Sequence, residues 1–194
     1  MRRGKPPIPP SAFIPAAERY YLMPAIDRWV VDQAFRQLGG RCSSQVSQSL
    51  PGLYAINLSG QSLCDESFAE FVISRLTTSG LAPSCICFEI TETAAVANLS
   101  RAIEFISRLK AMGCRFALDD FGSGLSSFGY LKNLPVDFLK IAGNFIRDLN
   151  VDPVDFAMVS AINQIGHVMG LATIAESVED QVLLAKEVTV RLIG

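Results

Sequence analysis

Two adjacent carboxylates, Asp119 and Asp120, end a short apolar stretch and stand before a loop rich in glycine and serine. Neighbouring residues of a strand point to opposite faces, so both can serve one site only where the regular strand geometry breaks. Gly122 and Gly124 supply such a break, because glycine reaches backbone angles that other residues avoid. A carboxylate pair there suits a hard divalent cation. A solvated turn is the alternative, since Asp, Gly and Ser are common turn residues.

A polar residue stands at the end of each of five short apolar stretches, which we predict to be strands. The stretches are 53–58, 85–90, 115–119, 138–141 and 171–175, and the polar residues are Asn57, Glu89, Asp119, Lys140 and Glu176. In each strand, the residues that share a face with the polar one are mostly small, and the opposite face is mostly larger and apolar. One such residue is more often a helix cap or turn residue, but five in succession predict convergence on one site.

Helical patterns alternate with these strands along the chain, and the helices must hold the strands in position. Helices are predicted near 17–38, 65–78, 99–112, 126–133, 153–169 and 178–187, and 188–193 is a doubtful last strand. Two apolar helix faces are expected, one formed by Leu22, Ile26, Trp29, Val30 and Ala34, the other by Leu99, Ala102, Ile103, Ile106 and Leu109. This order is typical of an α/β protein with a parallel sheet. With the polar residues pointing inward, we expect a barrel whose active site lies at the carboxyl ends of its strands.

The predicted site combines three carboxylates, an amide and a lysine. Carboxylate and amide oxygens suit Mg²⁺ or Mn²⁺ better than zinc. The single histidine, His167, falls within a helical pattern and is interpreted as structural. Without a histidine base, metal-activated water is the natural nucleophile, and Lys140 could neutralise charge on a phosphoryl group. The residues therefore predict metal-assisted hydrolysis of a phosphoester.

The chain has 194 residues, a net charge of −2 and five cysteines. This charge gives no reason to expect a nucleic-acid polymer as partner, and the sequence contains no membrane segment or signal peptide. The cysteines lack zinc-site spacing and are interpreted as buried free thiols of a cytoplasmic protein. We expect one domain over 1–194, with a proline-rich leader at 1–15 that forms no regular helix, a barrel core at 16–180 and a divergent or truncated tail at 181–194.

Six segments contain the polar residues in a characteristic order. They are Phe13-Ile14-Pro15-Ala16-Ala17-Glu18, Asn57-Leu58-Ser59, Glu89-Ile90-Thr91-Glu92, Asp119 to Ser127, Lys140-Ile141 and Ala175-Glu176-Ser177-Val178-Glu179. Together they resemble the motifs of the EAL domain family, the bacterial phosphodiesterases specific for cyclic di-GMP. Ser123 and Leu125 are variants of the family's Asp-Asp-Phe-Gly-Thr-Gly-Tyr-Ser-Ser loop. The resemblance covers residues of about 2–180.

The resemblance implies a TIM-like (β/α) barrel of the EAL type and opening of cyclic di-GMP to linear pGpG in bacterial signal transduction and biofilm control, with Mg²⁺ or Mn²⁺ as cofactor. It implies Asn57, Glu89, Asp119 and Asp120 as metal ligands, Lys140 as the residue that orients water or binds phosphate, and Glu176 as general base or a further metal-site residue. Glu92 would hold the 120–127 loop in its working position, and Arg2 would contact substrate. A homodimer through the 120–127 region is also implied.

Three departures from the family pattern predict an impaired fragment. The Glu-Ala-Leu glutamate is absent, and we expect Met1 to be an internal methionine; a stop codon directly before it would contradict this. The Asp-Tyr-x-Gln-Gly strand is absent from the far end, so the barrel would lack its first and last strands and expose two edges. Ala142 replaces the aspartate of Lys-Ile-Asp. With fewer anionic ligands, we expect very slow hydrolysis or none by this chain.

Three functions remain open at this point. The first is a phosphodiesterase domain, favoured by the retained polar residues. The second is a degenerate EAL domain that acts as a cyclic di-GMP receptor, favoured by Ala142. The third is an unrelated phosphate-handling barrel, which would need a glycine-rich phosphate loop after its late strands. Ser177-Val178 is not such a loop.

Overall fold

Five parallel strands form one sheet in the order β1-β2-β3-β4-β5. The computed structural model describes residues 8–39, 52–123 and 128–178. The strands are β1 Tyr54–Leu58, β2 Ile86–Thr91, β3 Arg115–Phe121, β4 Phe138–Ile141 and β5 Ala172–Ala175. Each predicted strand is present, with ends shifted by at most two residues. The predicted helix 178–187, the doubtful strand 188–193 and the tail 181–194 lie outside the described residues, apart from Val178.

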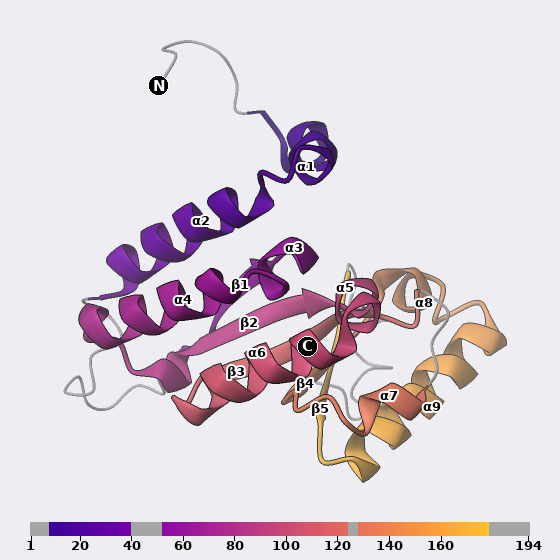
Figure 1. Ribbon diagram of the computed structural model, residues 1–194. Helices are drawn as coiled ribbons and strands as arrows, with labels where there is room; N and C mark the ends of the chain where they lie inside the picture. Colours follow the sequence, from indigo (N-terminus) through magenta and orange to yellow (C-terminus); the bar gives the residue numbers. More distant parts are fainter. Residues whose placement is uncertain (1–7, 40–51, 124–127, 179–194) are drawn as a thin grey trace.

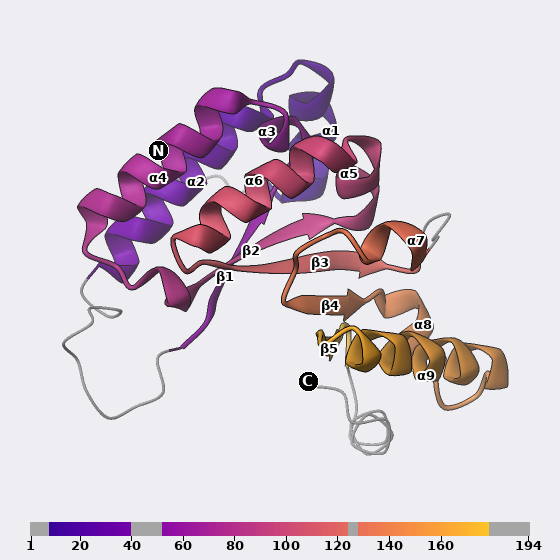
Figure 2. The same ribbon diagram turned by 60° about the horizontal axis from the view of Figure 1, so that its bottom comes forward.

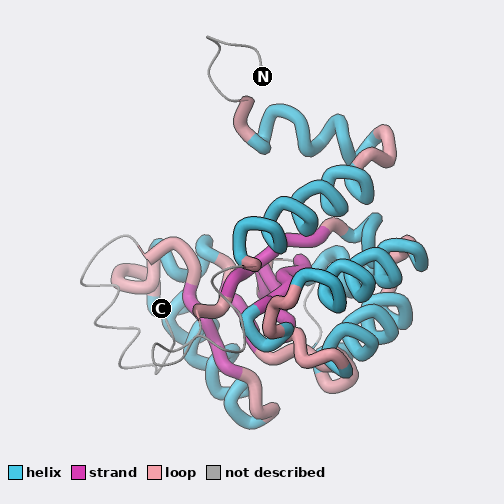
Figure 3. The backbone as a smooth tube through the Cα atoms, turned by 90° about the vertical axis from the view of Figure 1, so that its left-hand side faces the viewer, coloured by secondary structure: helices cyan, strands magenta, loops and turns pink. Residues whose placement is uncertain are grey.

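Helices connect successive strands and cover one face of the sheet. They are α1 Pro10–Arg19, α2 Met23–Leu38, α3 Gly60–Leu63, α4 Glu66–Ser79, α5 Glu92–Ala97, α6 Leu99–Ala111, α7 Phe128–Leu131, α8 Gly143–Arg147 and α9 Pro153–Val168, with a 3₁₀ turn at Pro83–Cys85. Figures 1 and 2 show α2, α4 and α6 side by side over the first strands, and α9 beside β4 and β5. Figure 3 shows the strands inside a layer of helices. The described strands thus form an arc of a TIM-like barrel.

The alternation of side chains along the strands decides which face the helices cover. One face carries Ile56, Phe88, Leu118, Leu139 and Ala175, which are all buried. Four phenylalanine rings continue this core outward from β2 and β3 to α6 and α4. The ring centroids of Phe88 and Phe116 lie 5.6 Å apart, those of Phe116 and Phe105 6.1 Å, and those of Phe105 and Phe68 6.0 Å. Such pairs stabilise a fold by about 0.5–1.5 kcal/mol each beyond their burial.

The apolar face predicted for α6 is confirmed, because Ala102, Ile106 and Leu109 are fully buried. The face predicted for α2 is wrong in part. Leu22 and Trp29 are 53 % and 65 % exposed. The helix instead buries a stripe formed by Met23, Asp27, Val31, Phe35 and Leu38. Periodicity alone could not decide between the two stripes, because both contain apolar residues at helical spacing.

The expectation of no regular helix before residue 16 is also wrong. Helix α1 begins at Pro10 and contains Pro15. Proline suits the first helical position, where its missing N–H would have no helical partner. Pro15 removes one hydrogen bond inside the helix and is tolerated there. Among the described residues, no helix combines the length and the apolar character that crossing a membrane requires.

Strand β3 continues past its predicted end at Asp119 and contains the distortion itself. The register with β4 shifts between Leu118 and Phe121, and Asp120 has a φ of +55°. Gly122 follows with a φ of +94°, and a side chain there would place its Cβ 2.8 Å from the ring of Phe145. The break in strand geometry that the carboxylate pair requires therefore begins at Asp120, two residues earlier than expected.

The cysteines divide into buried and exposed positions. Cys85, Cys87 and Cys114 are buried, whereas Cys64 is exposed, so the expectation of five buried thiols is wrong for Cys64. Cys85 ends the 3₁₀ turn and does not lie in the strand with Cys87. Cys42 lies outside the described residues.

We expect the buried thiols to resist alkylation in the folded protein. Burial raises the pKa of Cys87 and of Cys114 to about 12. Both thiols therefore stay protonated and unreactive across about pH 7–9, because the thiolate is the nucleophile. Iodoacetamide labelling followed by mass spectrometry should show modification at Cys64 but not at Cys87 or Cys114. In urea all three should react; rapid labelling of Cys87 or Cys114 without urea would contradict the burial.

Candidate functional site

Four of the predicted site residues meet at the carboxyl ends of adjacent strands. The Nζ atom of Lys140 lies 3.0 Å from Oε2 of Glu89, 2.8 Å from Oδ1 of Asp119 and 2.7 Å from Oε1 of Glu176. The Lys140, Glu89 and Asp119 side chains are only 12–14 % exposed, and that of Glu176 is 23 % exposed. We call these four residues the acidic cluster.

The strand register explains why these residues meet. Residues paired in a parallel ladder share a face, as do residues two apart in one strand. Glu89 pairs with Ala117, which shares its face with Asp119. Lys140 pairs with Ile174, two residues before Glu176. All four side chains consequently leave the sheet on the face opposite the helix-covered core.

Burial and charge act against each other in the acidic cluster. Burial by itself would lower the pKa of Lys140, but its hydrogen bonds with Asp119, Glu176 and Glu89 outweigh burial and raise that pKa above its usual value. Burial raises the pKa of Glu176, and the nearby Asp119 adds to this while Lys140 opposes it. With all groups ionised, three carboxylates and one ammonium leave two negative charges. This surplus of negative charge favours a divalent cation at the site over the single charge of the ammonium.

Asn57 and Asp120 lie near the acidic cluster without joining it. Asn57 is exposed in β1 and pairs with Glu89 in the ladder, so its amide lies on the cluster's face of the sheet. Asp120 is exposed and adjoins Asp119, whose Oδ1 accepts the Asp120 N–H at 3.1 Å. Among the described residues, neither side chain has a hydrogen bond or ion pair with Lys140. Arg2 lies outside the described part of the chain.

The donor set fits a hard divalent cation in its chemistry. It offers carboxylate oxygens from Glu89, Asp119 and Glu176, and the amide oxygen of Asn57 is on the same face. Across the described ranges, however, no three His, Cys, Asp or Glu side chains are grouped so as to hold a metal ion directly. The reason is visible in the distances, because the ammonium of Lys140 occupies the space between the carboxylates. A cation would have to take the place of this ammonium.

Ala142 follows β4 directly and is 2 % exposed. It occupies the N-cap position of α8, and its methyl group offers no cap for the helix. The aspartate that the resemblance predicts at this position would add a carboxylate two residues from Lys140. This chain has no anionic group there.

Glu92, the first residue of α5, connects the end of β3 to helix α7. Its side chain is buried, with 4 % exposure, and Oε2 accepts the Gly122 N–H at 2.9 Å. Oε1 accepts the hydroxyl of Tyr130 in α7. One buried carboxylate thus contacts both the turn after Asp120 and the helix that follows the 124–127 segment. Its role in holding the loop remains a prediction.

We expect Tyr130→Phe to lower the free energy of unfolding by about 1–2 kcal/mol, because it leaves one oxygen of a buried carboxylate without this donor. Urea unfolding measures the change. Tyr54→Phe is the matched control, since Tyr54 is half-buried and its hydroxyl has no hydrogen bond among the described residues. Equal losses in the two variants would show that the Glu92 contact contributes nothing specific.

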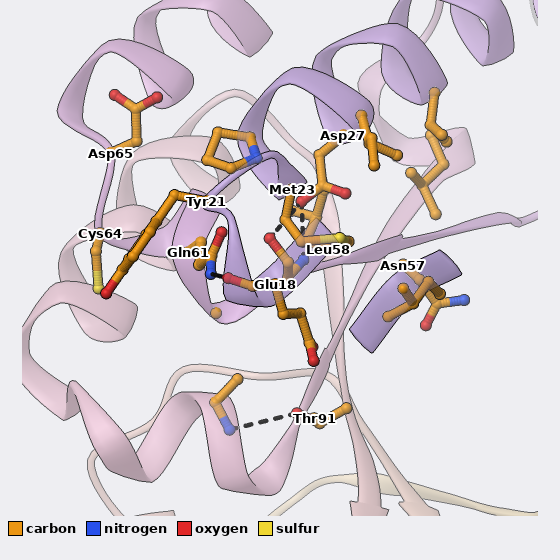
Figure 4. A pocket seen from close by; sticks show the side chains of 18 of the residues that line it. Glu18, Tyr21, Met23, Asp27, Asn57, Leu58, Gln61, Cys64, Asp65 and Thr91 are labelled. Atoms are coloured by element: carbon orange, nitrogen blue, oxygen red, sulfur yellow. Dashed lines mark hydrogen bonds between the residues drawn. The ribbon is translucent and has the colours of Figure 1, made fainter. Parts of the chain in front are cut away.

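A cavity of about 1090 Å³ lies beside β1 and is walled by α1, α2, α3 and α5. Its apolar wall includes Phe13, Ile14, Ile26, Val30 and Ala55, and Asn57 also lines it. Figure 4 shows Asn57, Asp27, Glu18 and Thr91 around this space. From the face predicted for α2, Ile26, Val30 and Ala34 therefore line this cavity, whereas Leu22 and Trp29 do not.

A parallel α/β barrel with carboxylates and a lysine at the ends of its strands is the class of protein that fold and site define. The family model described as EAL domain matches residues 2–186, and the chain belongs to this family. This confirms the family resemblance. Phosphodiesterases of this family depend on a metal ion.

Several curated relatives carry the name cyclic di-GMP phosphodiesterase, among them PdeB and PdeA. The chain is 44 % identical over 181 residues to PdeB of Shewanella oneidensis, covering 93 % of this chain and 21 % of PdeB. It is 36 % identical over 183 residues to PdeA of Borreliella burgdorferi, covering 94 % of this chain and 27 % of PdeA. The chain therefore spans about a quarter of the length of these relatives.

Two solved structures confirm the predicted fold class. The PaMucR phosphodiesterase, solved as a c-di-GMP complex, superposes with a TM-score of 0.86 at 34 % identity, over 95 % of this chain and 79 % of that chain. The EAL domain of Xanthomonas citri FimX, also in complex with c-di-GMP, superposes with a TM-score of 0.87 at 26 % identity, over 99 % of this chain and 74 % of that chain.

The sequence interpretation missed two residues near the site, Tyr130 and Asp27. Tyr130 has no local signal, because its partner Glu92 is 38 residues away. Asp27 does have one, since it is a carboxylate at helical spacing from Met23 and Val31 in the buried stripe of α2. A charged residue within an apolar stripe indicates hydrogen-bond partners in the core.

Proposed function

We propose that this chain is a cyclic di-GMP phosphodiesterase domain, which opens the cyclic dinucleotide to pGpG with the help of Mg²⁺ or Mn²⁺. One observation carries the proposal. In a member of the EAL domain family, Glu89, Asp119, Lys140 and Glu176 meet at the carboxyl ends of adjacent parallel strands. The surplus negative charge and the all-oxygen donor set suit a divalent cation, and phosphoester hydrolysis is the chemistry such a site performs.

Each residue has a proposed role that follows from its position. Asn57, Glu89, Asp119 and Asp120 would hold the metal, which would supply charge neutralisation and an activated water when bound. Lys140 would contact a phosphate oxygen or orient the attacking water, since it is the cation within the cluster. Glu176 would take up the proton of that water, and its raised pKa brings it closer to neutral pH than an ordinary glutamate.

Titration calorimetry of cyclic di-GMP into the 194-residue protein, with and without Mg²⁺ or Mn²⁺, tests the proposal. Chromatography of the same mixtures detects pGpG. We expect binding that depends on the metal and slow formation of pGpG, because Ala142 leaves the site without one carboxylate. Absence of binding under all conditions would refute the proposal. Binding without any pGpG would instead support a receptor.

The receptor function is the less favoured alternative. Ala142 supports it, because the family's aspartate is lost there. Against it, the acidic cluster retains all four of its residues, and the relatives named above are called phosphodiesterases. A site that only binds an anionic dinucleotide would gain nothing from retaining the three carboxylates of the acidic cluster.

The remaining parts of the proposal concern surroundings and partners. We place the domain in the cytoplasm, where the buried thiols Cys87 and Cys114 would stay reduced. Arg2 is proposed as a substrate contact, and the 120–127 region as the contact of a homodimer. We also propose a single domain over 1–194, since one continuous sheet runs through the described residues.

A further inference from the structure

Asp27 is a buried carboxylate with an unusual set of partners. It lies in α2 with 4 % exposure. Its Oδ2 atom accepts three hydrogen bonds, from the Ser59 N–H at 2.9 Å, the Ser59 hydroxyl at 2.7 Å and the Ser62 hydroxyl at 2.6 Å. No lysine, arginine or histidine in the described ranges forms an ion pair with it. Figure 4 shows Asp27 and Leu58 among the residues that line the cavity.

Such an arrangement is costly unless all of its donors are in place. Removing an ionised carboxylate from water without a cation requires compensating hydrogen bonds. Bonds to an ionised acceptor are short and stronger than neutral ones. The three donors of Asp27 come from one short segment, and two of them come from Ser59 alone. The carboxylate therefore fixes the position of Ser59 relative to α2.

Ser59 controls the turn that follows the candidate ligand Asn57. It is the N-cap of α3, and its hydroxyl accepts the Ser62 N–H at 3.2 Å. Asn57 stands two residues earlier, in a strand that pairs with β2 and with no other described strand. The exposed amide of Asn57 has no hydrogen bond of its own among the described residues. The ladder with β2 aligns the backbone of Asn57 with Glu89, and the contacts of Asp27 with Ser59 fix the chain directly after it.

We propose that Asp27 is a positioning residue that holds Asn57 where its amide oxygen can bind the metal. The inference rests on the proposed function, because it assumes that Asn57 is a ligand. It predicts that loss of the Asp27 charge weakens metal binding, although Asp27 itself is not a ligand. Residues that orient metal ligands from outside typically change metal affinity by about 10–100-fold.

The test is calorimetric titration of Mn²⁺ alone into wild type, Asp27→Asn and Asn57→Ala, with urea unfolding of the metal-free proteins alongside. We expect Asp27→Asn to bind Mn²⁺ about tenfold more weakly. We also expect the double variant Asp27→Asn/Asn57→Ala to bind Mn²⁺ no more weakly than Asn57→Ala alone. Both changes act on the same contact, that between the Asn57 amide and the metal. Asp32→Asn is the control, since Asp32 lies on the same helix and pairs with Arg36 and Arg75. It should bind Mn²⁺ like wild type.

Ser62→Ala keeps the inference testable if Asp27→Asn fails to fold. It removes one of the three bonds and retains both bonds from Ser59, so we expect a folded protein with a smaller loss of affinity in the same direction. Wild-type affinity in a destabilised but folded Asp27→Asn or Ser62→Ala would overturn the inference and leave the proposed function intact. Failure of the wild type itself to bind Mn²⁺ would refute the proposed function, and the inference with it. Mn²⁺ binding without formation of pGpG would count against hydrolysis alone and would leave the inference standing.

Discussion

Lys140→Met is expected to slow hydrolysis of cyclic di-GMP by about 10²–10³-fold, the range found when one charge-stabilising donor is removed from an active site. The same change should lower the free energy of unfolding by up to about 3 kcal/mol in the absence of divalent metal. The reason is that Glu89, Asp119 and Glu176 all contact the ammonium, and without it three partly buried carboxylates would repel one another. The rate of pGpG formation and urea unfolding measure the two effects.

Mg²⁺ provides a second test of this prediction. If the ammonium serves as the cation of the metal-free site, Mg²⁺ should stabilise Lys140→Met more than it stabilises the wild type. Lys110→Met is the matched control, because the Lys110 ammonium pairs with Asp137 at 2.7 Å, outside the cluster. It should keep the wild-type rate. A Lys140→Met protein with wild-type rate and wild-type stability would contradict the assignment of the cluster.

Glu89→Gln is expected to abolish hydrolysis with little change in stability, unlike Lys140→Met, which should affect both. Loss of a residue that supports a metal ligand typically lowers metal affinity by about 10–100-fold, and loss of a direct ligand should lower it at least as much. Hydrolysis by Glu89→Gln should therefore fall to background. Stability should change by less than about 1 kcal/mol, because Lys140 keeps its contacts with Asp119 and Glu176, and one repulsive charge is removed. Mn²⁺ titration, pGpG formation and urea unfolding of the same preparation provide the comparison.

Glu104→Gln is the control for Glu89→Gln. Its side chain is 59 % exposed, and its ion pair with Arg101 is long, at 3.8 Å. Metal affinity and turnover should match those of the wild type. If Glu89→Gln bound Mn²⁺ as tightly as Glu104→Gln, Glu89 could not be a ligand, and the proposed metal site would have to be abandoned.

The sheet and the meeting of the strand ends could be predicted because both follow from the two-residue period of a strand. Glu89, Asp119 and Lys140 each follow a residue of the buried face, so their common direction is fixed once the strands are parallel. The same reasoning could not place Asp120, whose positive φ takes its side chain out of the alternation. It also could not predict that Lys140 would lie between the carboxylates, which depends on side-chain conformations and not on register.

The helices were harder to predict where two structures satisfy the same pattern. Helix α2 has apolar residues on two sides, and only its packing on α4 and β1 determines that Val31 and Phe35 enter the core while Trp29 does not. The prolines before residue 16 indicated irregular chain, yet Pro10 begins α1. In this case the favourable first-turn position outweighed the general rule that proline breaks helices.

The row of four phenylalanine rings links the strands that carry Glu89 and Asp119 to α4 and α6. Because these rings interlock two strands and two helices, that layer can open only as a cooperative unit, and its amides should exchange with deuterium only in global unfolding. Glu89 and Asp119 are thereby attached to two strands whose buried sides contact each other through this row of rings. Lys140 lies in β4 and Glu176 follows β5, and neither strand contributes a ring to this row. Amide exchange in β4 and β5, compared with that in β2 and β3, would therefore show whether the two halves of the acidic cluster open together.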